Sequence, residues 1–126
     1  MAKNKKAKIK NVKKGRVYIS ASFNNTLVTV TDESGSTLGW GSTGLSGFKG
    51  TRKSTPYAAT TAVESTLNKV KESTGLSEVE VYVKGPGPGR DASLRAIKAI
   101  GLKISQIADV TPMPHNGPRA KKKRRP

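Results

Sequence analysis

Apolar and polar residues alternate where the central part of the chain begins. From Arg16 onward every second residue is apolar, so that Val17, Ile19, Ala21 and Phe23 alternate with Tyr18, Ser20 and Ser22. A period of two is typical of a strand with one buried face. We therefore predict a first strand whose four apolar side chains face the core.

Two further strands follow, separated by turn signals. Asn24 and Asn25 predict a tight turn, because asparagine tolerates a positive φ angle. Residues 27–31 (LVTVT) are rich in β-branched side chains and predict a second strand. The turn signal DESG at residues 32–35 leads into a third strand around residues 38–41, which completes an antiparallel meander.

A loop rich in glycine comes next. Glycines from Gly39 to Gly50 and the sequence FKGTRK at residues 48–53 predict a flexible loop with a basic tip. Thr55 and Pro56 then suit the N-cap and first position of a helix. The apolar residues of this helix follow helical spacing until Gly75 ends it: Ala59, Ala62, Val63, Leu67 and Val70.

The last part of the chain predicts a strand, a helix and a strand. The strand contains Val79, Val81 and Val83. The helix carries Leu94, Ile97 and Ile100 and ends at Gly101, and the final strand begins at Leu102 and shifts phase near Ile107 through a bulge. The order β-β-β-α-β-α-β predicts an α/β fold, a single layered domain with a mixed five-stranded sheet and helices.

Positive charge is concentrated at the two ends. The 126 residues include 24 Lys and Arg against 8 Asp and Glu, a formal charge of +16. Residues 1–16 carry eight of the cations and residues 112–126 carry six, and neither segment contains an acid. Such runs repel one another, stay disordered alone and commonly bind polyanions. We expect a basic N-terminal arm (residues 1–15), a globular α/β RNA-binding domain (16–111) and an extended basic C-terminal arm (112–126).

The composition excludes several classes of function. The chain has no cysteine, which excludes disulfides and thiolate metal sites, and the single His115 leaves no cluster to hold zinc. No uncharged run supplies the roughly 20 apolar residues of a membrane helix, and the basic N-terminus lacks the apolar stretch of a signal peptide. We expect an intracellular protein that uses no metal or cofactor and binds no membrane.

The sequence GPGPGR at residues 85–90 links a predicted strand to a predicted helix. A helix N-terminus can bind phosphate, but a nucleotide-binding loop needs Lys and then Ser or Thr, whereas this one ends in Arg90 and Asp91. Its two prolines also remove N–H donors. The loop either presents Arg90 rigidly to an RNA phosphate or is only a stiff turn, with Arg90 paired to an acid such as Asp109.

Other candidate residues give weaker signals. The acids are spread over a turn, a helix and a strand, which predicts no catalytic carboxylate pair. Trp40 lies on a predicted strand and is expected in the core. We expect no exposed aromatic pair of the kind that reads single-stranded RNA, which favours binding through backbone charge and shape. His115 lies in a proline-rich segment, residues 111–119. It either contacts RNA, by stacking on a base or binding a phosphate, or is an ordinary surface residue.

Four separated motifs resemble one known family. They are ASFNNT (residues 21–26), GFKGTRKSTPYAA (47–59), GPGPGR (85–90) and PHNG (114–117). Over about residues 12–126, in unbroken order, they closely resemble the small-subunit ribosomal protein eleven family in its bacterial form. The resemblance implies a domain of ribonuclease H-like topology without that activity, so no enzyme is expected.

The resemblance also implies a place on the platform of the small ribosomal subunit. There the protein would bind 16S-type ribosomal RNA, bridge RNA helices and line the Shine-Dalgarno cleft during translation. The other expected partners are neighbouring platform proteins, namely proteins seven and eighteen, messenger RNA near the Shine-Dalgarno helix and an initiation factor. The expected location is the cytoplasmic ribosome, with an organellar copy as the alternative.

The RNA-facing candidates come from the motifs and from the two arms. The motifs supply Asn24, Asn25, Lys49, Arg52, Lys53, Arg90, His115, Asn116 and Arg119. The arms add, by basic character, Lys3, Lys5, Lys6, Lys8, Lys10, Lys13, Lys14, Arg16, Lys121, Lys122, Lys123, Arg124 and Arg125.

Two other classes of function compete with this one. The composition equally permits a free nucleic-acid binder, such as a histone-like chromosomal protein. The sequence GPGPGR at residues 85–90, called the Gly-Pro loop below, leaves a phosphoryl-transfer enzyme as a third hypothesis. Co-sedimentation with the small subunit at high salt separates the first two, and metal-dependent nucleotide turnover would favour the third.

Overall fold

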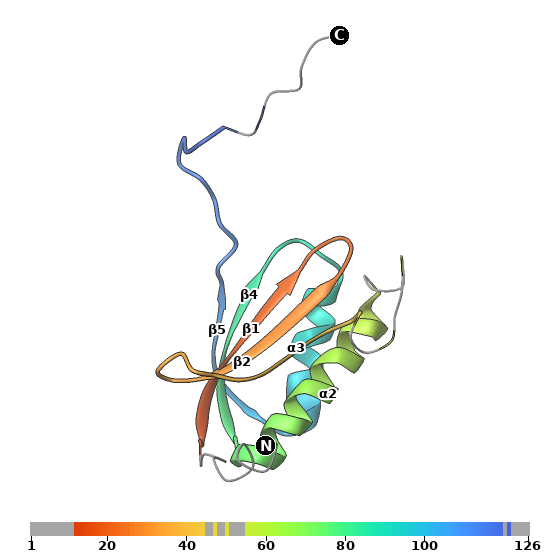
Figure 1. Ribbon diagram of the computed structural model, residues 1–126, viewed down its shortest axis with the longest axis vertical. Coiled ribbons are helices and arrows are strands. Elements are labelled where there is room, and N and C mark those ends of the chain that lie inside the picture. Colours follow the sequence, from red (N-terminus) through yellow and green to blue (C-terminus); the bar gives the residue numbers. More distant parts are fainter. Residues whose placement is uncertain (1–11, 45–46, 48–49, 51–54, 120, 122–126) are drawn as a thin grey trace, which may run out of the picture.

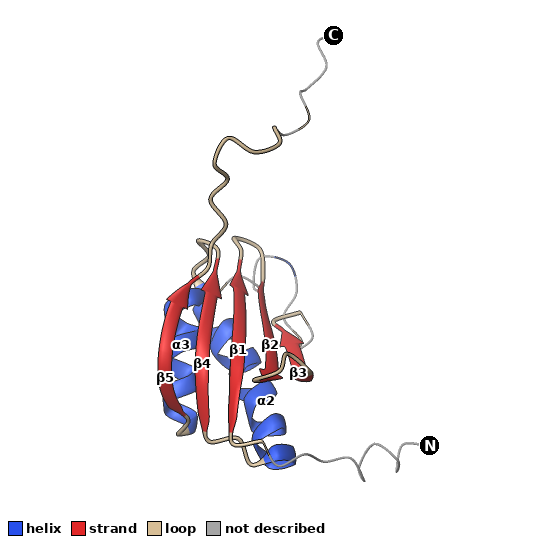
Figure 2. Cartoon of the chain, turned by 90° about the vertical axis from the view of Figure 1, so that its left-hand side faces the viewer, coloured by secondary structure: helices blue, strands red, loops and turns tan. Residues whose placement is uncertain are grey.

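The sheet and its helices are described by a computed structural model over residues 12–44, 47, 50, 55–119 and 121. In these residues the elements follow the predicted order: β1 (Lys14–Ala21), β2 (Thr26–Asp32), β3 (Thr37–Ser42), α2 (Pro56–Thr74), β4 (Glu78–Lys84), α3 (Gly89–Ile100) and β5 (Lys103–Asp109). Figure 1 follows the chain through these elements. The strand order is β3-β2-β1-β4-β5, with β2 antiparallel to both neighbours and β4 parallel to both (Figure 2). The predicted α/β domain with a mixed five-stranded sheet is confirmed.

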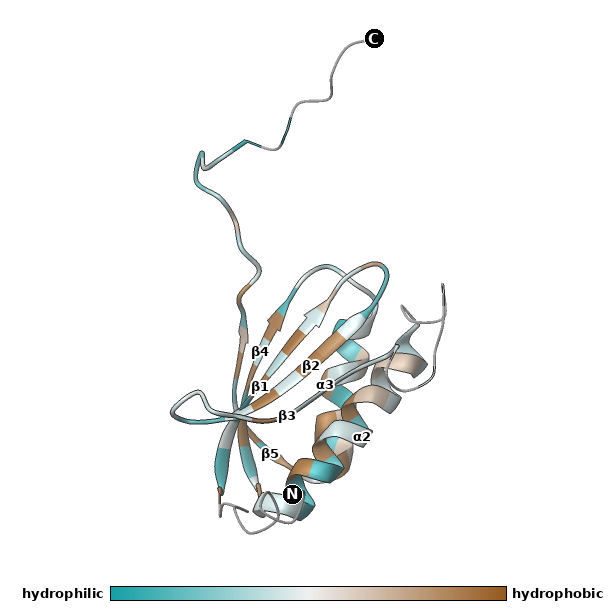
Figure 3. Ribbon diagram, in the orientation of Figure 1, coloured by the Kyte–Doolittle hydropathy of each residue, from teal (hydrophilic) through white to brown (hydrophobic). Residues whose placement is uncertain are grey.

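Both helices lie on the same face of the sheet (Figure 2). Alternate strand residues point toward them and form the core together with helix residues, among them Val17, Ile19, Val30, Val63, Leu67, Val81 and Ile97. Figure 3 shows the resulting alternation of hydrophobic and paler segments along the strands. In the part of the chain that the structure describes, no helix covers the opposite face, called the open face below.

The ends of the helices follow the sequence signals. Thr55 caps α2 by accepting a hydrogen bond from Ala58 N at 3.2 Å, and Gly75 ends it with φ of 75°. Gly101 ends α3 with φ of 97°. The predicted bulge in β5 is also present, because the register passes from Ile104 to Gln106 and leaves Ser105 between them.

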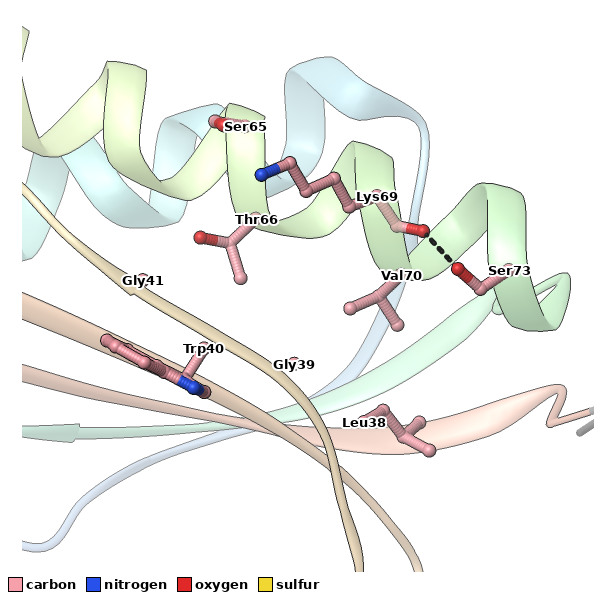
Figure 4. A pocket seen from close by; sticks show the side chains of 9 residues that line it. All are labelled: Leu38, Gly39, Trp40, Gly41, Ser65, Thr66, Lys69, Val70 and Ser73. Atoms are coloured by element: carbon pink, nitrogen blue, oxygen red, sulfur yellow. Dashed lines mark hydrogen bonds between the residues drawn. The ribbon is translucent and has the colours of Figure 1, made fainter. Parts of the chain in front are cut away.

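Trp40 is not in the core, contrary to the prediction. Its exposed fraction is 64%, because Gly39 and Gly41 are the residues of β3 that face α2 (Figure 4). A Cβ on Gly39 would lie 2.7 Å from Val70 Cγ2, and one on Gly41 would overlap Thr66 Oγ1. Helix and edge strand therefore pack closely over two glycines, and Trp40 points the other way.

The first hairpin is wider than predicted. Ala21 pairs with Thr26, so residues 22–25 form the connection, closed by a 2.8 Å hydrogen bond from Ser22 N to Asn25 O. Neither asparagine has a positive φ, which corrects the predicted turn type. Phe23, expected to face the core, is 71% exposed because β1 ends before it.

The strand β1 begins at Lys14, before the change of pattern at Arg16. Lys13 O accepts hydrogen bonds from Ser77 N at 3.0 Å and Glu78 N at 2.9 Å. The last residues of the expected N-terminal arm, Lys14 and Gly15, are therefore part of the sheet.

The Gly-Pro loop packs against the end of β1, and this contact is open to test. Gly87 N donates to Ala21 O at 2.8 Å, and a Cβ on Gly87 would overlap Ser22 O and lie 2.7 Å from the Ala21 carbonyl carbon. We expect Gly87→Ala to lower the free energy of unfolding by about 1–3 kcal/mol, because the two backbones must move apart. Denaturant unfolding monitored by circular dichroism measures this.

The matched control is Gly117→Ala in the C-terminal arm. There a Cβ would make an ordinary 3.5 Å contact with Pro114 Cβ, and the stability should stay within about 0.5 kcal/mol of wild type. Equal stability of the two variants would contradict the close packing of the Gly-Pro loop.

Candidate nucleic-acid interface

Several of the predicted RNA-facing residues lie at one edge of the sheet. The strands β1, β4 and β5 are parallel, so their C-terminal ends share this edge, called the carboxyl edge below (Figure 2). Asn24 and Asn25 follow β1, and Arg90 follows the loop after β4. Thr43 N donates to Thr26 O at 3.2 Å, which brings the residues after β3 to the same edge.

Asn25 supports this edge with its side chain. Its Oδ1 accepts hydrogen bonds from Thr26 N at 2.8 Å and from Thr43 Oγ1. Asn24 is exposed in the same turn. Of the two predicted asparagines, Asn25 therefore joins β2 to the residues after β3, and Asn24 is the more available to a ligand.

The described part of the C-terminal arm stands clear of the domain (Figure 2). All residues from 110 to 119 are exposed and belong to no helix or strand, and Lys121 is exposed as well. The predicted residues His115, Asn116 and Arg119 lie on this segment. The chain bends at His115 and Asn116, where Asn116 has φ of 58°. The pair Asn116-Gly117 is a typical turn signal and would have predicted the bend.

A network of hydrogen bonds holds the arm where it leaves the carboxyl edge. Asp109 Oδ1 accepts from Thr111 N at 2.9 Å and from Thr111 Oγ1 at 2.6 Å. Asp109 Oδ2 accepts from Arg90 Nη2 at 3.0 Å, and Arg90 Nη1 donates to Gly85 O at 2.8 Å. Gly85 N completes the network by donating to Thr111 Oγ1 at 3.1 Å. Gly85, Arg90, Asp109 and Thr111 are called the arm-root network below.

The network keeps Asp109 ionised. Hydrogen bonds from Thr111, with a further one from Arg90, lower the pKa of Asp109 from 3.8 to about 2. The internal alternative considered for Arg90, a pair with Asp109, is therefore present in the structure. A contact between Arg90 and RNA stays a prediction. Thr111 is a member that the sequence did not suggest.

Three predicted cations lie at the opposite end of the sheet, where β1 begins. Lys14 Nζ is 3.9 Å from Glu78 Oε2, and Arg16 Nε is 3.4 Å from Glu80 Oε1. Lys13 is exposed directly before the strand. The described candidates are thus divided between two ends of the domain.

The other predicted cations lie outside the described residues. They are Lys3, Lys5, Lys6, Lys8, Lys10, Lys49, Arg52, Lys53, Lys122, Lys123, Arg124 and Arg125. Their role in RNA binding stays a prediction.

The open face carries a pair of stacked tyrosines that the sequence did not predict. The parallel register places Tyr18 opposite Tyr82, and their rings stack with centroids 5.3 Å apart and planes 17° apart. The hydrogen bond from Tyr82 Oη to Glu80 Oε1, 3.0 Å long, raises the pKa of Tyr82. The alternating pattern predicted that both tyrosines point away from the core, but not that they lie on neighbouring strands.

One hollow among the described residues lies beside the edge strand β3. This hollow, of about 210 Å³, lies between β3 and α2, where Lys69 is the charged residue among the described side chains that line it (Figure 4). Within the described residues, no three His, Cys, Asp or Glu side chains gather where they could hold a metal ion. None of the described helices is long and apolar enough to cross a bilayer.

Comparison with known proteins identifies relatives over almost the whole chain. The family described as Ribosomal protein S11 matches residues 15–125. The "Small ribosomal subunit protein uS11" of Borreliella burgdorferi (strain ZS7) is 55% identical over 126 residues, which cover 99% of this chain and 96% of the relative. The protein of the same name from Azoarcus sp. (strain BH72) is 54% identical over 116 residues, 92% of this chain and 89% of the relative.

A third relative, the protein of that name from Neisseria meningitidis serogroup C, is 54% identical over 116 residues, 92% of this chain and 88% of the relative. These matches confirm the resemblance seen in the sequence. The chain therefore belongs to the ribosomal protein S11 family, whose members are structural constituents of the small ribosomal subunit.

Proposed function

We propose that the chain binds 16S-type ribosomal RNA on the platform of the small subunit and catalyses no reaction. The main support is the C-terminal arm, whose residues 112–119 are all exposed and extend away from the carboxyl edge. A segment with so little packing of its own is suited to fill space between RNA helices, where phosphates surround its cations.

The distribution of charge supports RNA as the ligand. Within the domain Lys14, Arg16 and Arg90 lie beside carboxylates of the same chain. Arg119 and Lys121 lie on the exposed arm, in a terminal segment of residues 112–126 that contains no acid. A cation without a nearby acid gives up no internal ion pair when it binds a phosphate. Its binding also releases counterions that the RNA holds, which favours the complex.

The two ends of the domain suit the bridging of RNA helices. The arm and Asn24 lie at the carboxyl edge, whereas Lys13 and Lys14 lie where β1 begins. In the proposal each end contacts a different helix of the RNA, and the protein lines the Shine-Dalgarno cleft. Platform proteins seven and eighteen, messenger RNA near that cleft and an initiation factor complete the proposed surroundings, in the cytoplasm.

In this proposal the domain positions the C-terminal arm through the arm-root network. Asp109 and Thr111 fix the first residues of the arm relative to β5, and Arg90 ties them to the Gly-Pro loop. An arm that starts in a set direction loses less conformational freedom when it meets RNA. The proposal therefore assigns Asp109, Thr111 and Arg90 the positioning of the arm.

Truncation after Pro118 tests the role of the arm, because it removes six cations. The slope of log affinity against log salt concentration should fall by as much as about 4, since each phosphate contact contributes about 0.7 on single strands. Titration of 16S-type RNA at several salt concentrations, with fluorescence anisotropy as the signal, measures this slope. A full-length variant with the six cations replaced by Gln should lose the same slope. If both variants kept the wild-type slope, the arm would not lie on RNA.

The pair of Arg90 and Asp109 can be tested by a double-mutant cycle. Arg90→Ala and Asp109→Ala should each lower the Tm, and the double variant should lower it by less than the sum, because either change alone breaks the pair. Arg95, exposed on the same helix, supplies the control: Arg95→Ala and Asp109→Ala should be additive. If Arg90→Ala weakened RNA binding at unchanged Tm, the phosphate contact would be favoured over the positioning role.

Asp109 also makes a predictable contribution to the dependence of stability on pH. Its pKa is about 2 in the folded chain against 3.8 ordinarily, so its stabilising effect is complete above about pH 4 and is lost as the pH falls toward 2. Asp109→Asn should therefore lose less stability over this window than wild type does, as measured by urea unfolding at several pH values. Glu72→Gln, on the exposed side of α2, is the control. Identical pH curves for wild type and Asp109→Asn would refute the assignment.

A further inference from the structure

The edge strand β3 exposes its largest side chain to solvent. Trp40 is 64% exposed and lies outside the hydrophobic core. Its neighbours Gly39 and Gly41 lie against α2, so the indole ring lies on the side of β3 away from that helix (Figure 4). A single exposed aromatic residue needs no special explanation. The groups that surround Trp40 therefore decide whether the ring has a role.

The backbone of Trp40 is also directed outward. Thr43 N donates to Thr26 O at 3.2 Å, so these two residues form a hydrogen-bonded pair between β3 and β2. Along an antiparallel ladder such pairs alternate with pairs that are not hydrogen-bonded. Trp40 pairs with Thr29, three positions further along, and this pair is therefore of the second kind. The N–H and C=O groups of Trp40 thus point away from β2, toward the edge of the sheet.

The hollow between β3 and α2 reaches Trp40 and contains a cation. Its volume is about 210 Å³, and Trp40, Ser65 and Lys69 are among the residues that line it. Ser65 and Lys69 are both exposed and lie one turn apart on the same face of α2 (Figure 4). Among the described residues that line this hollow, none carries a carboxylate. An aromatic residue with an outward N–H group and an unbalanced cation therefore border one hollow.

This combination fits single-stranded RNA. Proteins that bind single strands combine cations, which contact the phosphates, with aromatic rings on which the bases stack. A phosphate accepts strong hydrogen bonds from ammonium groups such as that of Lys69. The surface is also continuous with the candidate RNA-binding residues at the carboxyl edge, because Thr43, directly after β3, donates a hydrogen bond to Asn25. RNA that contacts Asn24 and Asn25 can therefore continue along β3.

We propose that β3 binds an unpaired nucleotide of the 16S-type RNA. The nucleotide wraps around the edge of the sheet. Its base stacks on the indole ring of Trp40, and its phosphate lies at the hollow, where it accepts hydrogen bonds from Trp40 N and Lys69 Nζ. Because every base has a face that can stack, the site recognises an unpaired nucleotide and not a particular sequence. The inference rests on the proposed RNA binding and adds two residues, Trp40 and Lys69, that the sequence did not suggest for it.

The fluorescence of Trp40 tests the proposal directly, because the chain contains no other tryptophan. The full-length chain is titrated into 16S-type RNA, with the anisotropy of a label on the RNA as the measure of binding. Emission of Trp40 with unlabelled RNA, excited at a wavelength that tyrosine does not absorb, measures the contact with the ring. We expect quenching that follows the same binding curve as the anisotropy, together with protection of the ring from acrylamide.

The two signals separate this inference from the RNA proposal. If RNA bound but Trp40 stayed bright and accessible to acrylamide, the stacking would be wrong and the RNA proposal would stand. The ring would then be left to a protein partner. If the anisotropy showed no binding, both would be overturned.

Variants at the two residues provide a second test. Trp40→Ala should weaken RNA binding about tenfold, because one stacked base is lost, and Trp40→Phe should recover part of this loss. Lys69→Gln should reduce the slope of log affinity against log salt concentration by about 0.7, the contribution of one phosphate contact. All three side chains are replaced on the surface, so the Tm should stay at the wild-type value.

The matched control is Arg95→Gln, which removes one exposed cation of α3 outside the hollow. Its affinity and its salt slope should equal those of wild type. Wild-type affinity in Trp40→Ala, or equal slopes in Lys69→Gln and Arg95→Gln, would contradict the proposed nucleotide site.

Discussion

The carboxylate of Asp109 joins the globular domain to its C-terminal arm. One of its oxygens holds Thr111 at the start of the arm, and the other holds Arg90, which in turn binds the carbonyl group of Gly85. The Gly-Pro loop reaches this position only because Gly85 and Gly87 approach the backbone of Ala21 and Ser22 more closely than a residue with a Cβ could. The direction of the arm thus depends on how a loop packs against the end of β1.

The cations of the domain differ in their surroundings. In our account most of the cations that contact RNA lie on the arms and at the ends of the strands. Arg16, on the open face of the sheet, lies 3.4 Å from Glu80 and is balanced by it. Arg119 and Lys121 lie on the exposed arm, in a terminal segment of residues 112–126 that contains no acid.

Local signals were sufficient to predict the elements of the fold. Thr55, Pro56 and Gly75 set the ends of α2 through backbone geometry that needs no distant partner. Trp40 was wrongly predicted to lie in the core, because a large apolar ring on a strand is usually buried. Gly39 and Gly41 on either side of it lie on the face that α2 approaches, so Trp40 lies on the opposite face. Phe23 was misplaced because an alternating pattern does not show where a strand ends.

Contacts between segments that are distant in the chain could not be predicted from the sequence. The stack of Tyr18 on Tyr82 depends on the register of β1 with β4, which local patterns do not encode. The sequence likewise left two roles open for Arg90. Only the parallel arrangement of β4 and β5 shows that its guanidinium reaches Asp109 and that Thr111 joins them.

The most direct measurement is the affinity of Asp109→Asn for 16S-type RNA over a range of salt concentrations. The arm keeps all its cations in this variant and loses only the fixed start that the carboxylate provides. Our account predicts weaker binding than wild type at every salt concentration with an unchanged slope, because the number of phosphate contacts is the same and the arm is less well positioned. Wild-type affinity throughout would contradict the claim that Asp109 positions the arm for RNA.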